Sequence, residues 1–245
     1  MDDAHVCNSF TIINKCVSYK AIIRIDIDDR LFLRDPESTE LGRNIVGSAI
    51  ELMEKLGYEE FTFKKLAGHI QSTEASVYRY FRNKHQLLSY LVSWYCGWLE
   101  YQIDILTNNI PEGEEQFRTA IRILSENSSY DPTYSHINEE LLHRIVMSEG
   151  TKTFLAHAVD ERNSEGYYNS FKSLILRIAD LILDVSPHYP TPRALANMLV
   201  INAMHQKYFA LHLPSITEFS TAQAPDSALA GFLIKSALRI IRDTE

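Results

Sequence analysis

The sequence is poor in cysteine and glycine, and it lacks the motifs that most often mark catalytic sites. Its 245 residues include three cysteines, Cys7, Cys16 and Cys96, and no C-x-x-C pair. An odd number at these spacings indicates neither a disulfide framework nor a zinc site. Glycine occurs nine times, without a glycine-rich phosphate loop, and neither H-E-x-x-H nor G-x-S-x-G is present. We therefore expect no enzymatic activity and no cofactor, and a protein of the reducing cytoplasm.

Membrane-directing features are also missing. No apolar run approaches the roughly 18 residues that a membrane-spanning helix needs. The chain opens with Met1-Asp2-Asp3, which is acidic where a signal peptide would be basic. We therefore expect no contact with a membrane and a cytoplasmic location.

The chain also lacks an excess of positive charge. The net charge of −8 argues against a protein that coats nucleic acid non-specifically, because such binding needs many lysines and arginines. The charge is unevenly distributed, however. Between Ser38 and Tyr90 seven basic residues face six acidic ones, so this segment carries +1 and the remainder −9. This segregation is typical of a compact DNA-contacting face on an acidic body.

Apolar residues recur at helical spacing along most of the chain, which predicts an all-α fold. Ser38 or Thr39 can cap a first helix that Gly57 ends. Asn83 can cap a long helix, with Gln86 reaching back in a capping box, and Pro111 follows its end near Asn108. Five further helices are predicted at about 114–126, 135–147, 164–185, 192–213 and 226–242.

The N-terminal extension, residues 1–37, departs from this helical pattern. Apolar and polar residues alternate towards Ile27, Asp28-Asp29 can form a turn, and Arg30–Leu33 resumes an extended pattern. These features predict a short β-hairpin. Because an isolated hairpin is only marginally stable in water, it would need the helical body or a second chain to lie on.

The most distinctive segment of the chain is Gly57–Lys84. Within it, Thr73 can cap a short helix, and Val77 and Phe81, four residues apart, form the buried stripe of that helix. This pattern directs Ser76, Arg79 and Tyr80 away from the core. A short helix that presents a hydroxyl, a cation and a phenol to solvent is typical of a DNA-recognition helix.

This segment resembles the helix-turn-helix of the TetR family of bacterial transcription regulators. The matching residues, in order and spacing, are Gly57-Tyr58, Thr62, Leu66-Ala67, Thr73, Ser76-Val77-Tyr78, Tyr80-Phe81 and Lys84. The resemblance covers about Leu41 to Leu88. Two positions depart from the family pattern: Gln71-Ser72 stands in the turn where Gly-Val is usual, and Glu74 stands where a basic or small residue is common. A glutamine enters the left-handed region only with some strain.

The resemblance implies a helix-turn-helix DNA-binding domain at residues 38–84 and a helical effector-binding and dimerisation domain at residues 85–245. It also implies the DNA contacts. Glu74, Ala75 and Ser76 would meet base edges, with Lys64 nearby. The residues expected to hold phosphates, or to present a helix start to them, are Thr62, Thr73, Tyr78, Arg79, Tyr80 and Lys84.

Aromatic residues mark one stripe of the long helix at spacings of four, four and three. They are Tyr90, Trp94, Trp98 and Tyr101, and the opposing candidates later in the chain are Tyr167, Tyr168 and Phe171. Such a stripe is most often packed core. The alternative is the wall of an apolar cavity, because the family places its effector pocket beside this helix and because Trp and Tyr can offer a polar edge to a ligand. The sequence leaves both interpretations open, and the effector would be a small apolar or aromatic molecule.

The last two long helices carry the prediction of a homodimer. Small residues along them would let two copies pack into a four-helix bundle about a twofold axis. The candidate interface residues are Leu199, Asn202, Ala203, Gln206, Ala210, Ala228, Phe232 and Lys235.

No metal site is predicted. His136 and His143 are two turns apart, about 10.5 Å along a helix, too far to share one ion. With Glu139 and Glu140 they are interpreted as a solvated helix face.

The functional hypothesis is therefore a DNA-binding transcription regulator, a repressor that a small-molecule effector releases from a pseudo-palindromic operator. The main alternative is a TetR-like regulator that a protein partner controls through the N-terminal hairpin. A third hypothesis, an enzyme built on the helical body, has no catalytic constellation behind it.

Overall fold

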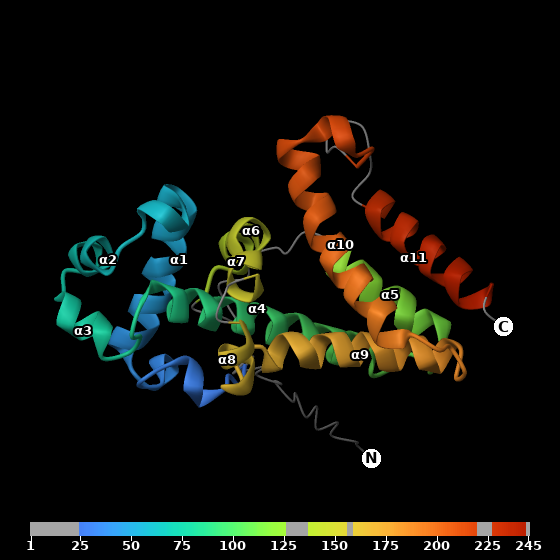
Figure 1. Ribbon diagram of the computed structural model, residues 1–245, viewed down its shortest axis with the longest axis horizontal. Coiled ribbons are helices and arrows are strands. Elements are labelled where there is room, and N and C mark those ends of the chain that lie inside the picture. The colour runs from blue at the N-terminus through green and yellow to red at the C-terminus, as the bar shows by residue number, and fades with distance from the viewer. Residues whose placement is uncertain (1–24, 126–136, 156–158, 220–226, 244–245) are drawn as a thin grey trace, which may run out of the picture.

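The computed structural model describes residues 25–125, 137–155, 159–219 and 227–243. Figure 1 shows an elongated molecule with a small group of helices at one end and a larger helical body at the other. The described residues contain α-helices and short 3₁₀-helices, and no strand occurs among them. The predicted all-α fold is confirmed for these residues.

The small domain, here called the reader, consists of α1 (Glu40–Glu60), α2 (Phe63–His69) and α3 (Glu74–Tyr78). Threonine caps each helix: Thr39, Thr62 and Thr73 accept hydrogen bonds from the third residue after each, at 3.0, 3.2 and 3.2 Å. Gly57 adopts φ 77°, so α1 kinks there and one further turn follows. The predicted end of this helix at Gly57 is thus a kink.

The body is formed by α4 (Lys84–Thr107), α5 (Glu114–Ser125), α6 (Glu139–Glu149), α7 (Thr151–Phe154), α8 (Val159–Ser164), α9 (Asn169–Val185), α10 (Pro192–His212) and α11 (Ser227–Arg242). Helices α4 and α9 run side by side along the body, and α10 packs across α9. The sequence predicted six of these helices to within a few residues at most ends. The short helices α7 and α8 were not predicted.

Helix α4 belongs to both parts of the molecule. Asn83 caps it by accepting from the Gln86 N–H at 2.8 Å. Gln86 reaches back as predicted, although its Oε1 accepts from the Arg82 N–H, also at 2.8 Å. Leu87, Leu88 and the residues that follow as far as Cys96 are buried. The core therefore runs without interruption from the reader into the body.

The described part of the N-terminal extension is not a hairpin. Residues 29–31 and 36–38 form 3₁₀-helices, each started by an aspartate whose carboxylate accepts a backbone N–H: Asp28 from Arg30 at 3.1 Å and Asp35 from Glu37 at 2.8 Å. The prediction of a second strand at Arg30–Leu33 is wrong, because these caps compete with extended pairing. Residues 21–24, the start of the other predicted strand, lie outside the described residues.

Residues 25–38, here called the arm, are instead packed on both parts of the molecule. Leu31 is fully buried, and Gln86 Nε2 donates to the Arg30 carbonyl at 3.1 Å. A Cβ on Gly42 would lie 2.3 Å from the Pro36 carbonyl oxygen, so only glycine permits this close approach of the arm to α1. Asn169, at the start of α9, donates to the Asp28 carboxylate at 2.9 Å.

Candidate nucleic-acid interface and effector cavity

The turn between α2 and α3 sets the angle at which α3 projects. Gln71 adopts φ 52°, the one positive φ among the described non-glycine residues. The glutamine therefore enters the left-handed conformation that glycine would adopt more easily. The Ser72 N–H closes the turn by donating to the Ala67 carbonyl at 2.8 Å.

Most of the predicted DNA-contacting side chains share one solvent-facing surface of the reader. Thr62, Lys64, Thr73, Glu74, Ala75, Tyr78 and Arg79 are all exposed. Tyr78 is 48% exposed, and its ring lies edge-on to Phe63 at 5.0 Å, which fixes its direction. Arg79 Nη2 donates to Ser76 Oγ at 3.2 Å, and that hydroxyl also lies 2.9 Å from Thr73 Oγ1. Hydroxyl groups therefore tie the two ends of α3 together.

Two side chains that were predicted to point away from the core are buried instead. Tyr80 is 2% exposed, and its hydroxyl lies 2.7 Å from Thr39 Oγ1. Ser76 is also buried. The pattern misplaced Tyr80 because α3 ends at Tyr78, so helical spacing does not extend to residue 80. Tyr80 supports the reader from inside and cannot hold a phosphate in this conformation.

Lys84 lies at the reader–body junction. Its ammonium donates to the carbonyls of Tyr58 and Glu59 at 2.9 and 3.0 Å and lies 4.5 Å from the centre of the Tyr58 ring. These carbonyls end α1, where the negative end of the helix dipole favours a cation. Lys84 thus joins the start of α4 to the end of α1.

A small cavity lies inside the body, about three turns along α4 from Lys84. Its volume is about 10 Å³, roughly the space for one water molecule. Its lining comes from α4, α6, α7, α9 and α10. The lining residues are Val92, Cys96, Val146, Met147, Gly150, Thr151, Phe154, Phe171, Ile201, Met204 and His205. Burial raises the pKa of the Cys96 thiol to about 12, so this thiol stays protonated.

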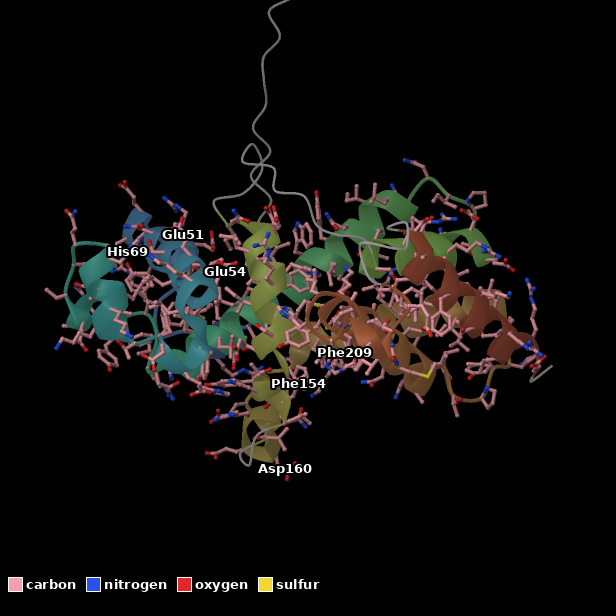
Figure 2. The ribbon with its side chains drawn as sticks, turned by 90° about the horizontal axis from the view of Figure 1, so that it is seen from above. Glu51, Glu54, His69, Phe154, Asp160 and Phe209 are labelled. Carbon is pink, nitrogen blue, oxygen red and sulfur yellow. The ribbon has the colours of Figure 1, made fainter. Side chains whose placement is uncertain are left out.

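The predicted aromatic stripe lies mostly elsewhere. Phe171 lines this cavity and stacks on Phe154, which is labelled in Figure 2, with ring centres 5.2 Å apart. The other six candidates do not line it. Tyr90, Trp94, Trp98 and Tyr168 are buried in the packed core, Tyr167 is half-buried and Tyr101 is 38% exposed. Most of the stripe is therefore buried without lining this cavity, which adjoins the face of α4 with Val92 and Cys96.

Buried polar groups lie on three of the helices that line the cavity, α4, α6 and α10. The Tyr95 hydroxyl of α4 lies 2.5 Å from His143 Nδ1 of α6, and Glu139 of α6 and Lys207 of α10 are also buried. Burial lowers the pKa of His143 to about 3, with the charges of Lys207 and Arg144 acting in the same direction. The interpretation of Glu139 and His143 as a solvated face is wrong, and His136 lies outside the described residues. The described residues contain no group of three or more side chains suited to a metal.

Helices α10 and α11 carry the predicted dimer face at the end of the molecule far from the reader (Figure 1). Phe232 and Lys235 of α11 are exposed, and Asn202, Gln206 and Ala228 are partly so. Exposed apolar side chains, Met198, Leu211, Phe232 and Ile240, accompany them. The dimer-interface prediction is wrong for three residues of α10. Leu199, Ala203 and Ala210 are buried within the protomer, where α10 packs on its neighbouring helices.

Residues 45–91 match the model of a family described as bacterial regulatory proteins, tetR family. This match covers most of α1, all of α2 and α3 and the first turns of α4, and the exposed set described above lies within it. The chain carries the DNA-binding domain of the TetR family. The resemblance predicted from the sequence is thereby confirmed. Among the described residues, no helix is both long and apolar enough to cross a bilayer.

Solved structures share the TetR fold beyond the reader. AibR in complex with isovaleryl coenzyme A and operator DNA is 16% identical, with TM-score 0.54 over 79% of this chain and 97% of that one. A tetR-family regulatory protein from Rhodococcus RHA1 is 14% identical, with TM-score 0.55 over 83% and 97%. The fatty acid degradation regulator FadR from Bacillus halodurans is 13% identical, with TM-score 0.51 over 80% and 93%. No curated protein sequence matches the chain.

The TetR-type reader contacts the body through ion pairs as well as through α4. Arg144 of α6 pairs with Glu54 of α1 at 3.1 Å, and Lys152 of α7 pairs with Glu59 at 2.7 Å. Figure 2 shows Glu54 on the side of the reader that faces α6. Glu149 and Glu59 together raise the pKa of Lys152 to about 12. Since Thr151 and Phe154 line the cavity, α7 contacts the cavity and the end of α1 at once.

Proposed function

We propose that this TetR-family regulator is a homodimeric repressor that a small apolar effector releases from a pseudo-palindromic operator. The observation that carries the proposal is the exposed set Thr62, Lys64, Thr73, Glu74, Ala75, Tyr78 and Arg79 on one surface of the reader. In a dimer, two such surfaces would enter successive major grooves about 34–36 Å apart.

Base reading falls to the first turn of α3. Glu74 and Ala75 are exposed there, and a glutamate can accept a hydrogen bond from cytosine N4. The same carboxylate repels every phosphate that approaches it. Glu74 therefore suits discrimination between sequences rather than affinity.

The variant Glu74→Ala tests this assignment. We expect it to bind non-specific duplex several-fold more tightly and to lose about 1–3 kcal/mol of preference at one base pair in each half-site. Selection of binding sites from a random duplex library by parent and variant measures both effects. Glu51→Ala, which removes the same charge from α1, is the control and should return the parental consensus. An unchanged consensus for Glu74→Ala would remove Glu74 from base reading.

Effector binding is proposed at the cavity between α4, α6, α7, α9 and α10. The cavity as described holds about 10 Å³, so an effector must separate these helices, and the closed form is the state proposed to bind DNA. AibR, which shares the fold, was crystallised with isovaleryl coenzyme A and operator DNA. A mostly apolar lining that includes Thr151 and His205 suits an acyl group with one polar end.

Isovaleryl coenzyme A and straight-chain acyl coenzyme A molecules are the first probes. A binder present at 100 times its Kd should stabilise the protein by about 2.7 kcal/mol. The binder should also weaken operator binding, and the operator should weaken binding of the small molecule by the same factor. Met204→Trp, which fills the cavity, should abolish both effects, whereas Leu176→Trp at an exposed position of α9 should keep them. If Met204→Trp responds like the parent, the effector binds elsewhere.

The alternative of control through an N-terminal hairpin gains no support from the described residues. Residues 25–38 already pack against α1, α4 and α9 through Pro36, Leu31 and Asp28. This part of the extension is occupied by contacts within the chain.

A further inference from the structure

The arm reaches the end of the recognition helix from a part of the chain outside the family match. The Leu33 N–H donates to the Tyr80 carbonyl at 2.7 Å, two residues beyond α3. The guanidinium of Arg34 then lies 5.6 Å from the centre of the Tyr80 ring. Because Tyr80 is itself buried and bonded to Thr39, this ring is a fixed platform for Arg34.

Three exposed arginines belong to the segments that join here. Arg34 comes from the arm, and Arg79 and Arg82 flank Tyr80 in the segment after α3. Among the described residues none of the three forms an ion pair with a carboxylate. Lys65 of the reader differs in this respect, since it pairs with Glu60 at 3.2 Å.

The acidic residue next to Arg34 in sequence forms a cap and no ion pair with any of these three described arginines. The Asp35 carboxylate accepts the Glu37 N–H at 2.8 Å and starts a 3₁₀-helix. Glu74 stands five residues before Arg79, at the opposite end of α3. Helix α3 therefore begins with an acid and is followed by two cations, of which Arg79 reaches back along the helix to Ser76.

We propose that Arg34, together with Arg79 and Arg82, binds the phosphate backbone of duplex DNA, so that the arm forms a third part of the DNA interface. The inference rests on the proposed function. A planar guanidinium held against an aromatic ring has less conformational freedom to lose when it contacts a phosphate. A phosphate contact carries no base information, so Arg34 adds affinity to every sequence. It offsets the repulsion from Glu74.

The test compares the full chain with Arg34→Met and Arg34→Lys, on the operator obtained by selection and on an unrelated duplex of equal length. Arg34→Met keeps the packing of the side chain's stem and removes the charge. We expect it to weaken binding to both duplexes by similar factors and to lower the slope of log Kobs against log salt by about one per half-site. Arg34→Lys should keep the slope close to that of the parent, because its charge remains.

Arg193→Met, an exposed arginine at the start of α10, is the matched control and should leave both affinity and slope unchanged. Melting temperatures separate a folding defect from a lost contact. If Arg34→Met keeps the parental salt slope, or if Arg34→Lys loses it as fully as Arg34→Met, the phosphate contact is refuted and Arg34 serves only to pack on Tyr80. A parent protein that prefers no sequence would instead refute the proposed function itself.

Discussion

Phe232→Asp is expected to turn the dimer into a monomer and to weaken dimerisation on the order of 1000-fold. Phe232 is 51% exposed on α11 and packs against Phe219 with ring centres 5.4 Å apart. Buried aromatic anchors at interface centres contribute about 2 kcal/mol or more each. About a twofold axis every substitution occurs twice, and about 4 kcal/mol corresponds to nearly three powers of ten in Kd.

Loss of the dimer should also weaken operator binding, because a single reader reaches only one half-site. Sedimentation gives the oligomeric state, and titration of the selected operator gives the affinity. The control is Leu155→Asp, which places the same charge on an 81% exposed leucine after α7 and should stay dimeric. If Phe232→Asp sediments like the parent, the dimer forms through another surface.

The fold was predictable where local sequence and tertiary structure agree. Thr73 and Asn83 cap helices as their position predicts, because a capping bond depends only on neighbours three residues away. The long amphipathic helices have boundaries set by caps, prolines and apolar spacing, and all of these are visible in the sequence. The short helices α7 and α8 lack such signals over enough residues to be recognised.

The candidate site was less predictable, because lining and burial are tertiary properties. Val92 and Cys96 carry no feature that separates a cavity wall from packed core. Tyr80 follows the end of α3, so its direction depends on where the helix stops rather than on periodicity. The arm was misjudged for a related reason: alternation at Ile25 and Ile27 fits a strand, yet Asp28 caps a 3₁₀-helix immediately afterwards.

The buried imidazole of His143 leads to the second large effect. It lies next to the cavity, 2.5 Å from the Tyr95 hydroxyl, and is 8% exposed. Burial lowers its pKa to about 3, whereas a histidine in the unfolded chain titrates near 6.5. Between these values the unfolded state binds the additional proton. The stability contributed by the neutral imidazole is therefore present above about pH 6.5 and is lost as the pH falls towards 3.

Between pH 7.5 and pH 5 the parent is expected to lose about 2 kcal/mol of unfolding free energy through His143. In His143→Gln this part of the loss should be absent. The figure follows because each pH unit below 6.5 costs about 1.4 kcal/mol while the folded imidazole stays neutral. Urea unfolding at both pH values and one protein concentration measures it. The variant loses ring packing at both pH values, so the difference between them is the relevant quantity.

His85, whose pKa burial lowers to about 4, keeps part of the parental pH dependence in the variant. His188→Gln, at an exposed site between α9 and α10, should change nothing. Equal pH dependence in parent and His143→Gln would mean that His143 is protonated in the folded protein, and that the contact between α4 and α6 beside the cavity is charged at pH 5.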